Sequence, residues 1–137
     1  MARARVLVVE DSPTILAIKV AILESAGYET VGAVDAIEAI LRVREDAPDL
    51  ILLDVRLPDM NGYQVCRLLR NDDEHKDIPI IMASASDTEK KDEFWGVQTG
   101  ADAYLVEPFE PQELLGLVQF VMRARMKDPG PRRGASA

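Results

Sequence analysis

The sequence has few of the residues that crosslink a chain or anchor it in a membrane. It contains one cysteine, which excludes an intramolecular disulfide and a cysteine-cluster metal site. Its apolar runs are too short for a membrane span or a signal peptide. Positive charge is also scarce, because 16 Lys and Arg face 24 Asp and Glu and the net charge is -8. We therefore expect a cytoplasmic protein that binds neither nucleic acid nor membranes.

The length and composition are those of one folded domain. Hydrophobic residues make up 47% and charged residues 29% of the 137 residues, so the chain can bury a substantial core. We expect a single domain over residues 4–126 and a disordered tail over residues 127–137. This length leaves no room for a separate output module.

Short apolar runs alternate with longer segments whose apolar residues recur every three or four positions. This alternation predicts an α/β fold, a single doubly wound domain of five strand and helix pairs around a parallel sheet. Ser12 and Pro13 begin the first helix, and Ile15, Ile18 and Ile22 mark one of its faces. The other predicted helices cover residues 36–46, 61–72, 87–99 and 111–126. The predicted strands cover residues 6–9, 30–33, 50–53, 78–83 and 103–106.

Acidic residues follow three of the predicted strands. Glu10 and Asp11 follow the first strand, Asp54 ends the third, and Glu107 follows the fifth. Ser84 ends the fourth strand. The carboxyl ends of parallel strands share one edge of a sheet, where open α/β proteins bind ligands. Carboxylates gathered there repel one another unless a cation is bound, and Mg²⁺ suits them because it keeps positions for water and phosphate oxygens.

Four ordered blocks at these strand ends resemble a known family. The blocks are Glu10-Asp11-Ser12, residues 53–62 (LDVRLPDMNG), Ser84-Ala85 and residues 100–109 (GADAYLVEPF). With them, residues 4–126 closely resemble the receiver domain of two-component response regulators. Residues 94–96 (FWG) are also similar to single-domain regulators of twitching and gliding motility. The resemblance implies a flavodoxin-like (βα)5 fold with the strand order 2-1-3-4-5.

The resemblance also implies a role for each acidic residue at this edge. Asp54 is the expected phosphoryl acceptor, a carboxylate nucleophile. Asp11 and Asp54 are the expected ligands of Mg²⁺, and Glu10 would hold the waters of the ion. The backbone carbonyl of Arg56 would complete the metal's ligand shell. The ion then neutralises charge on the transferring group while the acceptor is held in line.

Two further residues and the partners follow from the same resemblance. Ser84 would donate a hydrogen bond to a phosphoryl oxygen, and Tyr104 would rotate inward behind it. The implied protein is a phosphorelay signalling module and not an enzyme. It would receive the phosphoryl group from a histidine kinase or a phosphotransfer protein, and signal by contact with a separate target protein.

One position departs from the family pattern. Where the family has a lysine before the proline that follows the fifth strand, this chain has Glu107 before Pro108. A glutamate there predicts repulsion of a phosphoryl group on Asp54. Rotation of the Glu107 side chain toward solvent or Arg56 would relieve this repulsion. We also predict a cis peptide between Glu107 and Pro108, because the family turns sharply here and cis costs little before proline.

Other interpretations of these residues stay open. Asp54 is alternatively a turn or cap residue, and Glu10 with Asp11 a solvated acidic loop. Ser84 is alternatively a hydroxyl satisfied by the backbone, and Tyr104 a packed aromatic residue.

The function likewise has alternatives. The first is a phosphoacceptor switch, and the second is an interaction module that works without phosphorylation, with Glu107 as the mark of that loss. A haloacid-dehalogenase-type phosphatase fits less well, because Arg56 stands where its second Asp is needed. A flavodoxin fits less well because Glu10 and Asp11 would repel the flavin phosphate.

Overall fold

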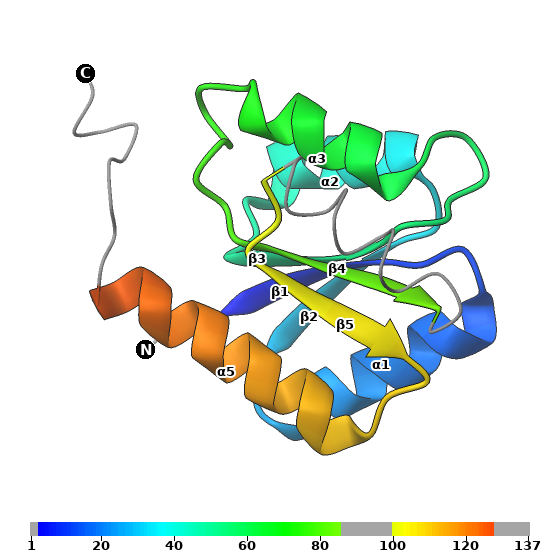
Figure 1. Ribbon diagram of the computed structural model, residues 1–137, viewed down its shortest axis with the longest axis vertical. Coiled ribbons are helices and arrows are strands. Elements are labelled where there is room, and N and C mark those ends of the chain that lie inside the picture. Colours follow the sequence, from blue (N-terminus) through cyan, green and yellow to red (C-terminus); the bar gives the residue numbers. More distant parts are fainter. Residues whose placement is uncertain (1–2, 86–99, 128–137) are drawn as a thin grey trace.

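The computed structural model describes residues 3–85 and 100–127, which fold as a parallel sheet between two layers of helices (Figure 1). The predicted flavodoxin-like fold is confirmed, since the strands pair in the order β2-β1-β3-β4-β5. The strands are β1 (Arg5–Val9), β2 (Glu29–Ala33), β3 (Leu50–Asp54), β4 (Ile80–Ala85) and β5 (Ala103–Glu107). The described helices are α1 (Pro13–Ser25), α2 (Ala36–Asp46), α3 (Gly62–Arg70) and α5 (Pro111–Lys127).

The sheet register brings the ends of distant strands together. Val9 at the end of β1 pairs with Ala33 of β2 and with Leu53 of β3. Asp54 at the end of β3 pairs with Ala83 of β4. Every strand pair is parallel, so the carboxyl ends of all five strands lie at one edge, which we call the carboxyl edge.

Each face of the sheet has its own hydrophobic cluster. Leu7 and Val9 of β1 face the cluster shared with α2 and α3, whereas Val6 and Val8 face the cluster shared with α1 and α5. The side chains alternate between the faces because successive residues of a strand point in opposite directions. With helices on both faces, the central strands are buried throughout, and all five residues of β3 are buried.

Of the three isoleucines that predicted the buried face of α1, Ile22 packs against the hydrophobic cluster but the other two do not lie in the core. Ile15 and Ile18 are 41% and 51% exposed, whereas Lys19 and Leu23 are fully buried. The start of the helix is as expected, since the Ser12 hydroxyl accepts a hydrogen bond from the backbone N–H of Ile15 at 3.3 Å. The reason for the error is that α1 is apolar on most of its circumference, so that periodicity alone does not select the buried side.

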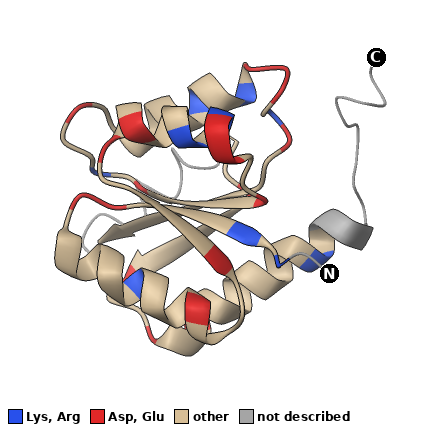
Figure 2. Ribbon diagram, turned by 180° about the vertical axis from the view of Figure 1, so that it is seen from behind, with Lys and Arg blue, Asp and Glu red and all other residues tan. Residues whose placement is uncertain are grey.

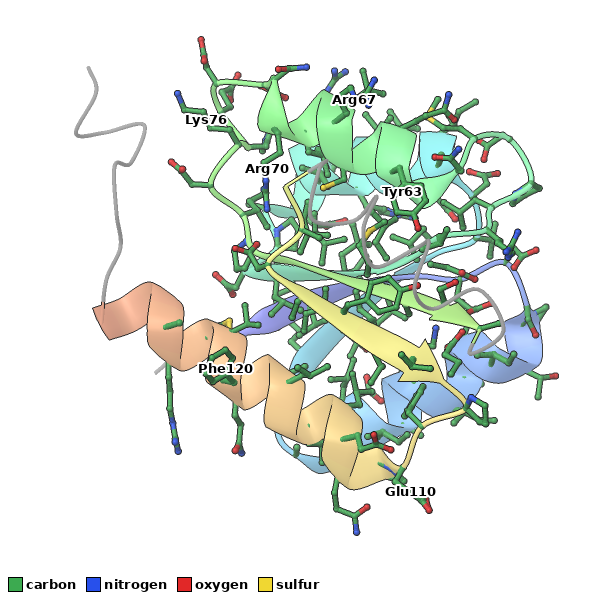
Figure 3. The ribbon with its side chains drawn as sticks, viewed as in Figure 1. Tyr63, Arg67, Arg70, Lys76, Glu110 and Phe120 are labelled. Carbon is green, nitrogen blue, oxygen red and sulfur yellow. The ribbon has the colours of Figure 1, made fainter. Side chains whose placement is uncertain are left out.

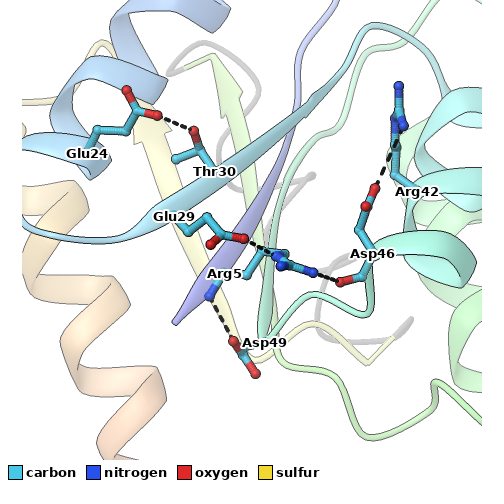
Figure 4. Close-up of polar contacts among 7 residues, drawn as sticks. All are labelled: Arg5, Glu24, Glu29, Thr30, Arg42, Asp46 and Asp49. Atoms are coloured by element: carbon cyan, nitrogen blue, oxygen red, sulfur yellow. Dashed lines mark hydrogen bonds and ion pairs between the residues drawn. The ribbon is translucent and has the colours of Figure 1, made fainter. Parts of the chain in front are cut away.

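Two arginines tie elements together at the opposite edge of the sheet, where the strands begin. Arg5 forms an ion pair with Glu29 and donates to the carbonyl of Asp46, while its N–H donates to Asp49 at 2.7 Å (Figure 4). Arg70 extends from the end of α3 (Figure 3) and donates to Asp102 at 2.9 Å. These contacts fasten α2, α3 and the strand starts, and leave the carboxyl edge as the place for a site.

Several predictions about the chain ends and the fourth helix fall on residues that the structure does not describe. The predicted helix over residues 87–99 and the segment 94–96 lie outside the described residues, as do residues 128–137. Helix α5 reaches Lys127, one residue into the predicted tail. None of the described helices is both long enough and apolar enough to cross a membrane.

The loop after β3 passes very close to the end of that strand at Gly62. The N–H of Gly62 donates to the carbonyl of Val55 at 2.7 Å, and Asn61 and Gln64 form a capping box around it. A Cβ at residue 62 would lie 2.5 Å from the carbonyl oxygen of Asp54. Only glycine therefore allows α3 to begin so close to the end of β3.

We expect Gly62→Ala to lower the free energy of unfolding by about 1 to 3 kcal/mol, because the added methyl group collides with backbone that cannot rotate away. Urea denaturation measures this change. Gly116→Ala in α5 is the matched control, since a Cβ there meets no atom within 4 Å. The control should be stabilised by about 0.5 to 1 kcal/mol through its helix propensity. Equal stability of Gly62→Ala and the wild type would contradict the close approach.

Candidate functional site

Three carboxylates from two adjacent strands meet at the carboxyl edge. Glu10 and Asp11 follow β1, and Asp54 ends β3. One oxygen from each lies within 4.8 Å of the other two, which is close enough to share a metal ion. Glu10 and Asp54 are buried, at 3% and 8% exposure, while Asp11 is exposed. The sheet thus brings together the three acidic residues that were predicted to form a metal site.

Asp54 is the most perturbed carboxyl group of this cluster. Burial is the main cause, and with the nearby charges of Glu10 and Glu107 it raises the pKa of Asp54 to about 7. The N–H of Arg56, which donates to Asp54 Oδ1 at 3.0 Å, opposes this rise, as does the charge of Lys19. A cation at the site would lower this pKa and keep the carboxylate ionised at neutral pH.

Lys19 supplies a buried positive charge beside these carboxylates. Its Nζ lies 2.7 Å from Glu10 Oε1 and 2.9 Å from Glu107 Oε2, and its side chain is fully buried. Burial alone would lower the pKa of Lys19, but the hydrogen bonds and charges of Glu10 and Glu107 outweigh it and raise that pKa. Lys19 therefore stays protonated and links α1 to the ends of β1 and β5.

The position of Glu107 corrects the prediction that its charge turns toward solvent or Arg56. Glu107 pairs with Lys19, and its side chain is only 23% exposed. Arg56 is exposed at the surface. The physical reason is that the ammonium group of Lys19 is already buried against the end of β5, so the nearest counter-charge comes from α1. The predicted cis peptide between Glu107 and Pro108 is confirmed.

Ser84 and Tyr104 lie on the two strands that complete the site. Ser84 is 2% exposed near the end of β4, where it pairs with Val106 of β5. Tyr104 of β5 is half-buried and packs against the hydrophobic cluster on the α2 and α3 side of the sheet. The hydrogen bond of Ser84 to a phosphoryl group and the inward rotation of Tyr104 stay predictions.

Lys19 is the residue of the site that sequence reasoning missed. It is the only charged residue between Ile15 and Leu23, in an otherwise apolar stretch. Helical spacing places it on one stripe with Leu16 and Leu23, one turn from each. A lone charge on an apolar stripe is the signal that could have indicated a buried ion pair and suggested Lys19, in place of Arg56, as the partner of Glu107.

The fold and the site together identify the class of protein. A doubly wound α/β domain with an acidic cluster at its carboxyl edge, centred on a strand-end aspartate, is the architecture of a response regulator receiver domain. The sequence model of the response regulator receiver domain matches residues 6–119. The chain belongs to this family.

Curated relatives match the chain over part of their own length. The DNA-binding response regulator MtrA of Mycolicibacterium smegmatis is 40% identical over 127 residues, which is 93% of this chain and 54% of that protein. The phosphate regulon transcriptional regulatory protein PhoB of Klebsiella pneumoniae is 42% identical over 123 residues, 90% of this chain and 53% of that protein. The chain thus spans about half the length of these relatives.

Solved structures match it over nearly their whole length. The chemotaxis protein CheY4 of Vibrio cholerae has a TM-score of 0.82 and 35% sequence identity, covering 88% of this chain and 99% of that one. A CheY-like receiver domain protein of Methanospirillum hungatei has a TM-score of 0.85 and 28% identity, covering 92% of this chain and 98% of that one. The receiver fold therefore accounts for most of the chain.

We expect the stability of the metal-free protein to fall as the pH rises from 4 to 8, in part because of Asp54. Its folded-state pKa of about 7 exceeds the ordinary 3.8, so the folded state holds this proton more tightly. The resulting contribution of Asp54 to the free energy of unfolding is fully present below about pH 4 and is lost as the pH rises through 7.

Asp54→Asn removes the buried charge while keeping an acceptor for the N–H of Arg56. In EDTA at pH 8, its free energy of unfolding should exceed that of the wild type by about 2 to 4 kcal/mol, and by much less at pH 5. Urea denaturation at both pH values measures the difference. Asp73→Asn is the control, because that side chain is 96% exposed and its substitution should have little effect at either pH. If the free energies of unfolding of Asp54→Asn and the wild type differed by the same amount at pH 5 and pH 8, the prediction that Asp54 becomes charged in a buried position over this range would be contradicted.

Proposed function

We propose that this receiver domain accepts a phosphoryl group on Asp54 and signals through contacts with another protein. The observation that carries the proposal is the placement of Asp54, buried at the end of β3 with its carboxylate oxygen within 4.8 Å of those of Glu10 and Asp11. Receiver domains are in general signalling modules and not enzymes. The proposed chemistry is a single transfer to the protein itself.

The donor set of the site suits a hard divalent cation. Three carboxylates offer oxygen ligands, and the exposure of Asp11 leaves room for water on the ion. We assign Asp11 and Asp54 as ligands of Mg²⁺, with Glu10 holding its waters and the Arg56 carbonyl as a further ligand. When bound, Mg²⁺ neutralises charge on the phosphoryl oxygens.

The transfer step needs Asp54 to be ionised and held in position. Its carboxylate oxygen forms a bond to phosphorus as the donor's phosphorus–nitrogen bond breaks, and the phosphohistidine of a kinase leaves as a histidine that takes up a proton. The N–H of Arg56 orients the carboxylate through Oδ1. Ser84 then donates a hydrogen bond to a phosphoryl oxygen, and Tyr104 moves behind it to alter the surface near β5.

The proposed partners are a histidine kinase or phosphotransfer protein and a separate target protein. We place the contact with the target on the side of α5 where Phe120 is 67% exposed (Figure 3). Asp and Glu are spread over the helices and loops on both sides of the sheet (Figure 2). The DNA binding named for the MtrA relative is that of a protein of which the matched region covers 54%.

Glu107 favours a second candidate function, an interaction module that works without phosphorylation. In this alternative the fold and the acidic edge are kept, but the phosphoryl group is not retained. The ion pair between Glu107 and Lys19 at 2.9 Å weakens this alternative, because the negative charge of Glu107 is already balanced within the protein. Phosphorylation of Asp54 separates the two candidates.

We expect Mg²⁺ to bind at a single saturable site in the wild type. Asp11→Ala should abolish this binding, because it removes the ligand that is open to solvent. Isothermal titration calorimetry at pH 7.5 measures both proteins. Asp73→Ala is the control for the lost charge, since that side chain is 96% exposed in the loop between α3 and β4. Unchanged affinity in Asp11→Ala would refute the assignment of the site.

Acetyl phosphate with excess Mg²⁺ should add one phosphoryl group to the wild type, and none to Asp54→Asn. The acetate leaves as the new phosphorus–oxygen bond forms, so the reaction needs no kinase. Intact-protein mass spectrometry detects the product, and peptide mapping locates it at residue 54. An unmodified wild type would favour the interaction module, and modification of Asp54→Asn would place the acceptor elsewhere.

A further inference from the structure

Lys19 is buried where a structural role alone does not account for it. Ion pairs buried in a protein interior recover little more than the cost of desolvating their charges, and apolar residues of similar size often stabilise a fold more. The residues around Lys19 in α1 are apolar, yet its Nζ reaches the carboxyl edge and contacts both Glu10 and Glu107. Both contacts are with carboxylates beside the proposed phosphoryl acceptor.

The geometry gives Lys19 two distinct contacts. On the β1 side, Nζ of Lys19 donates a hydrogen bond to Glu10 Oε1. The other oxygen, Glu10 Oε2, accepts a hydrogen bond from the N–H of Ser12 at 3.2 Å. Toward β5, Lys19 holds Glu107 Oε2 at 2.9 Å. The positive charge thus fixes both acidic side chains from the α1 side of the sheet, and it directs the carboxylate of Glu107 toward α1.

We propose that Lys19 is the counter-charge that makes Glu107 compatible with phosphorylation of Asp54. In the family a lysine stands at position 107, whereas here the buried lysine comes from α1 and pairs with the partly buried Glu107. Lys19 is a positioning residue, because it acts by neutralising and orienting Glu107. This inference rests on the proposed function, since it concerns the reactivity of Asp54.

Four proteins form a cycle that tests the pair: the wild type, Lys19→Met, Glu107→Gln and the double variant Lys19→Met/Glu107→Gln. Each is treated with acetyl phosphate and excess Mg²⁺, and the rate of phosphorylation of Asp54 and the lifetime of the product are measured. Lys19→Met keeps an unbranched side chain, one atom shorter, but leaves both Glu107 and Glu10 without their counter-charge. Its rate should fall by about tenfold or more, because a like charge then faces the incoming phosphoryl group.

The double variant should recover to within about threefold of the wild type, since it lacks both charges of the pair. Glu107→Gln should react at least as fast as the wild type. A further variant, Lys19→Met/Glu107→Lys, returns the lysine to the family position and should also react at least as fast. A merely structural role for Lys19 would not produce recovery by removal of its partner.

Lys76→Met is the matched control, because it removes the same charge in the loop before β4, at the opposite edge of the sheet (Figure 3). Its rate should equal that of the wild type. Circular dichroism establishes which variants fold. If Lys19→Met alone does not fold, the two double variants carry the test, and rates far below the wild type in both would overturn the pairing.

The outcomes separate this inference from the function on which it rests. A wild type that reacts while Lys19→Met reacts equally fast overturns the role of Lys19 and leaves the proposed function in place. A double variant that stays as slow as Lys19→Met shows that Glu107 is not the partner through which Lys19 acts. A wild type that does not react overturns the proposed function, and the role of Lys19 with it.

Discussion

Repulsion between like charges at the carboxyl edge is the constraint on which the site depends. The parallel sheet brings Glu10, Asp11, Asp54 and Glu107 to the same edge, and two of them are almost fully buried. Such a cluster persists in a folded protein only where protons, cations or fixed positive groups offset it. Lys19 offsets part of the charge permanently, while burial, with the charges of Glu10 and Glu107, raises the pKa of Asp54. A divalent ion at this edge would offset the remaining negative charge.

Much of the fold could be predicted because local patterns and topology agree. The uninterrupted apolar run of β3 indicates a strand covered on both faces, and the strand-end acids follow from the common direction of parallel strands. The start of α1 was predictable from Ser12 and Pro13, whose capping and backbone preferences are local properties.

The predictions of the buried face of α1 and of the partner of Glu107 were wrong because contacts between separate elements, which the local sequence does not show, determine both. Ile15 and Ile18 of α1 have the spacing of a buried face, but the sheet edge offered an acidic environment that suits Lys19 better. The partner of Glu107 was likewise missed, because Arg56 is near Asp54 in sequence whereas Lys19 approaches from a different layer. Proximity along the chain is a poor guide to ion pairs that join separate elements.

The ion pair between Lys19 and Glu107 also restricts how this sequence can change over time. Substitution of Lys19 alone leaves Glu10 buried without its counter-charge, and breaking a buried pair in this way typically costs about 3 to 5 kcal/mol, a large part of the stability of a small domain. Substitution of Glu107 alone leaves Lys19 paired with Glu10. Position 19 is therefore the more constrained of the two, and a glutamate at position 107 depends on it for a counter-charge from a distant part of the chain. A comparison that examines position 107 by itself would class such a chain as degenerate, whereas one that examines both positions would recognise a different solution to the same charge balance.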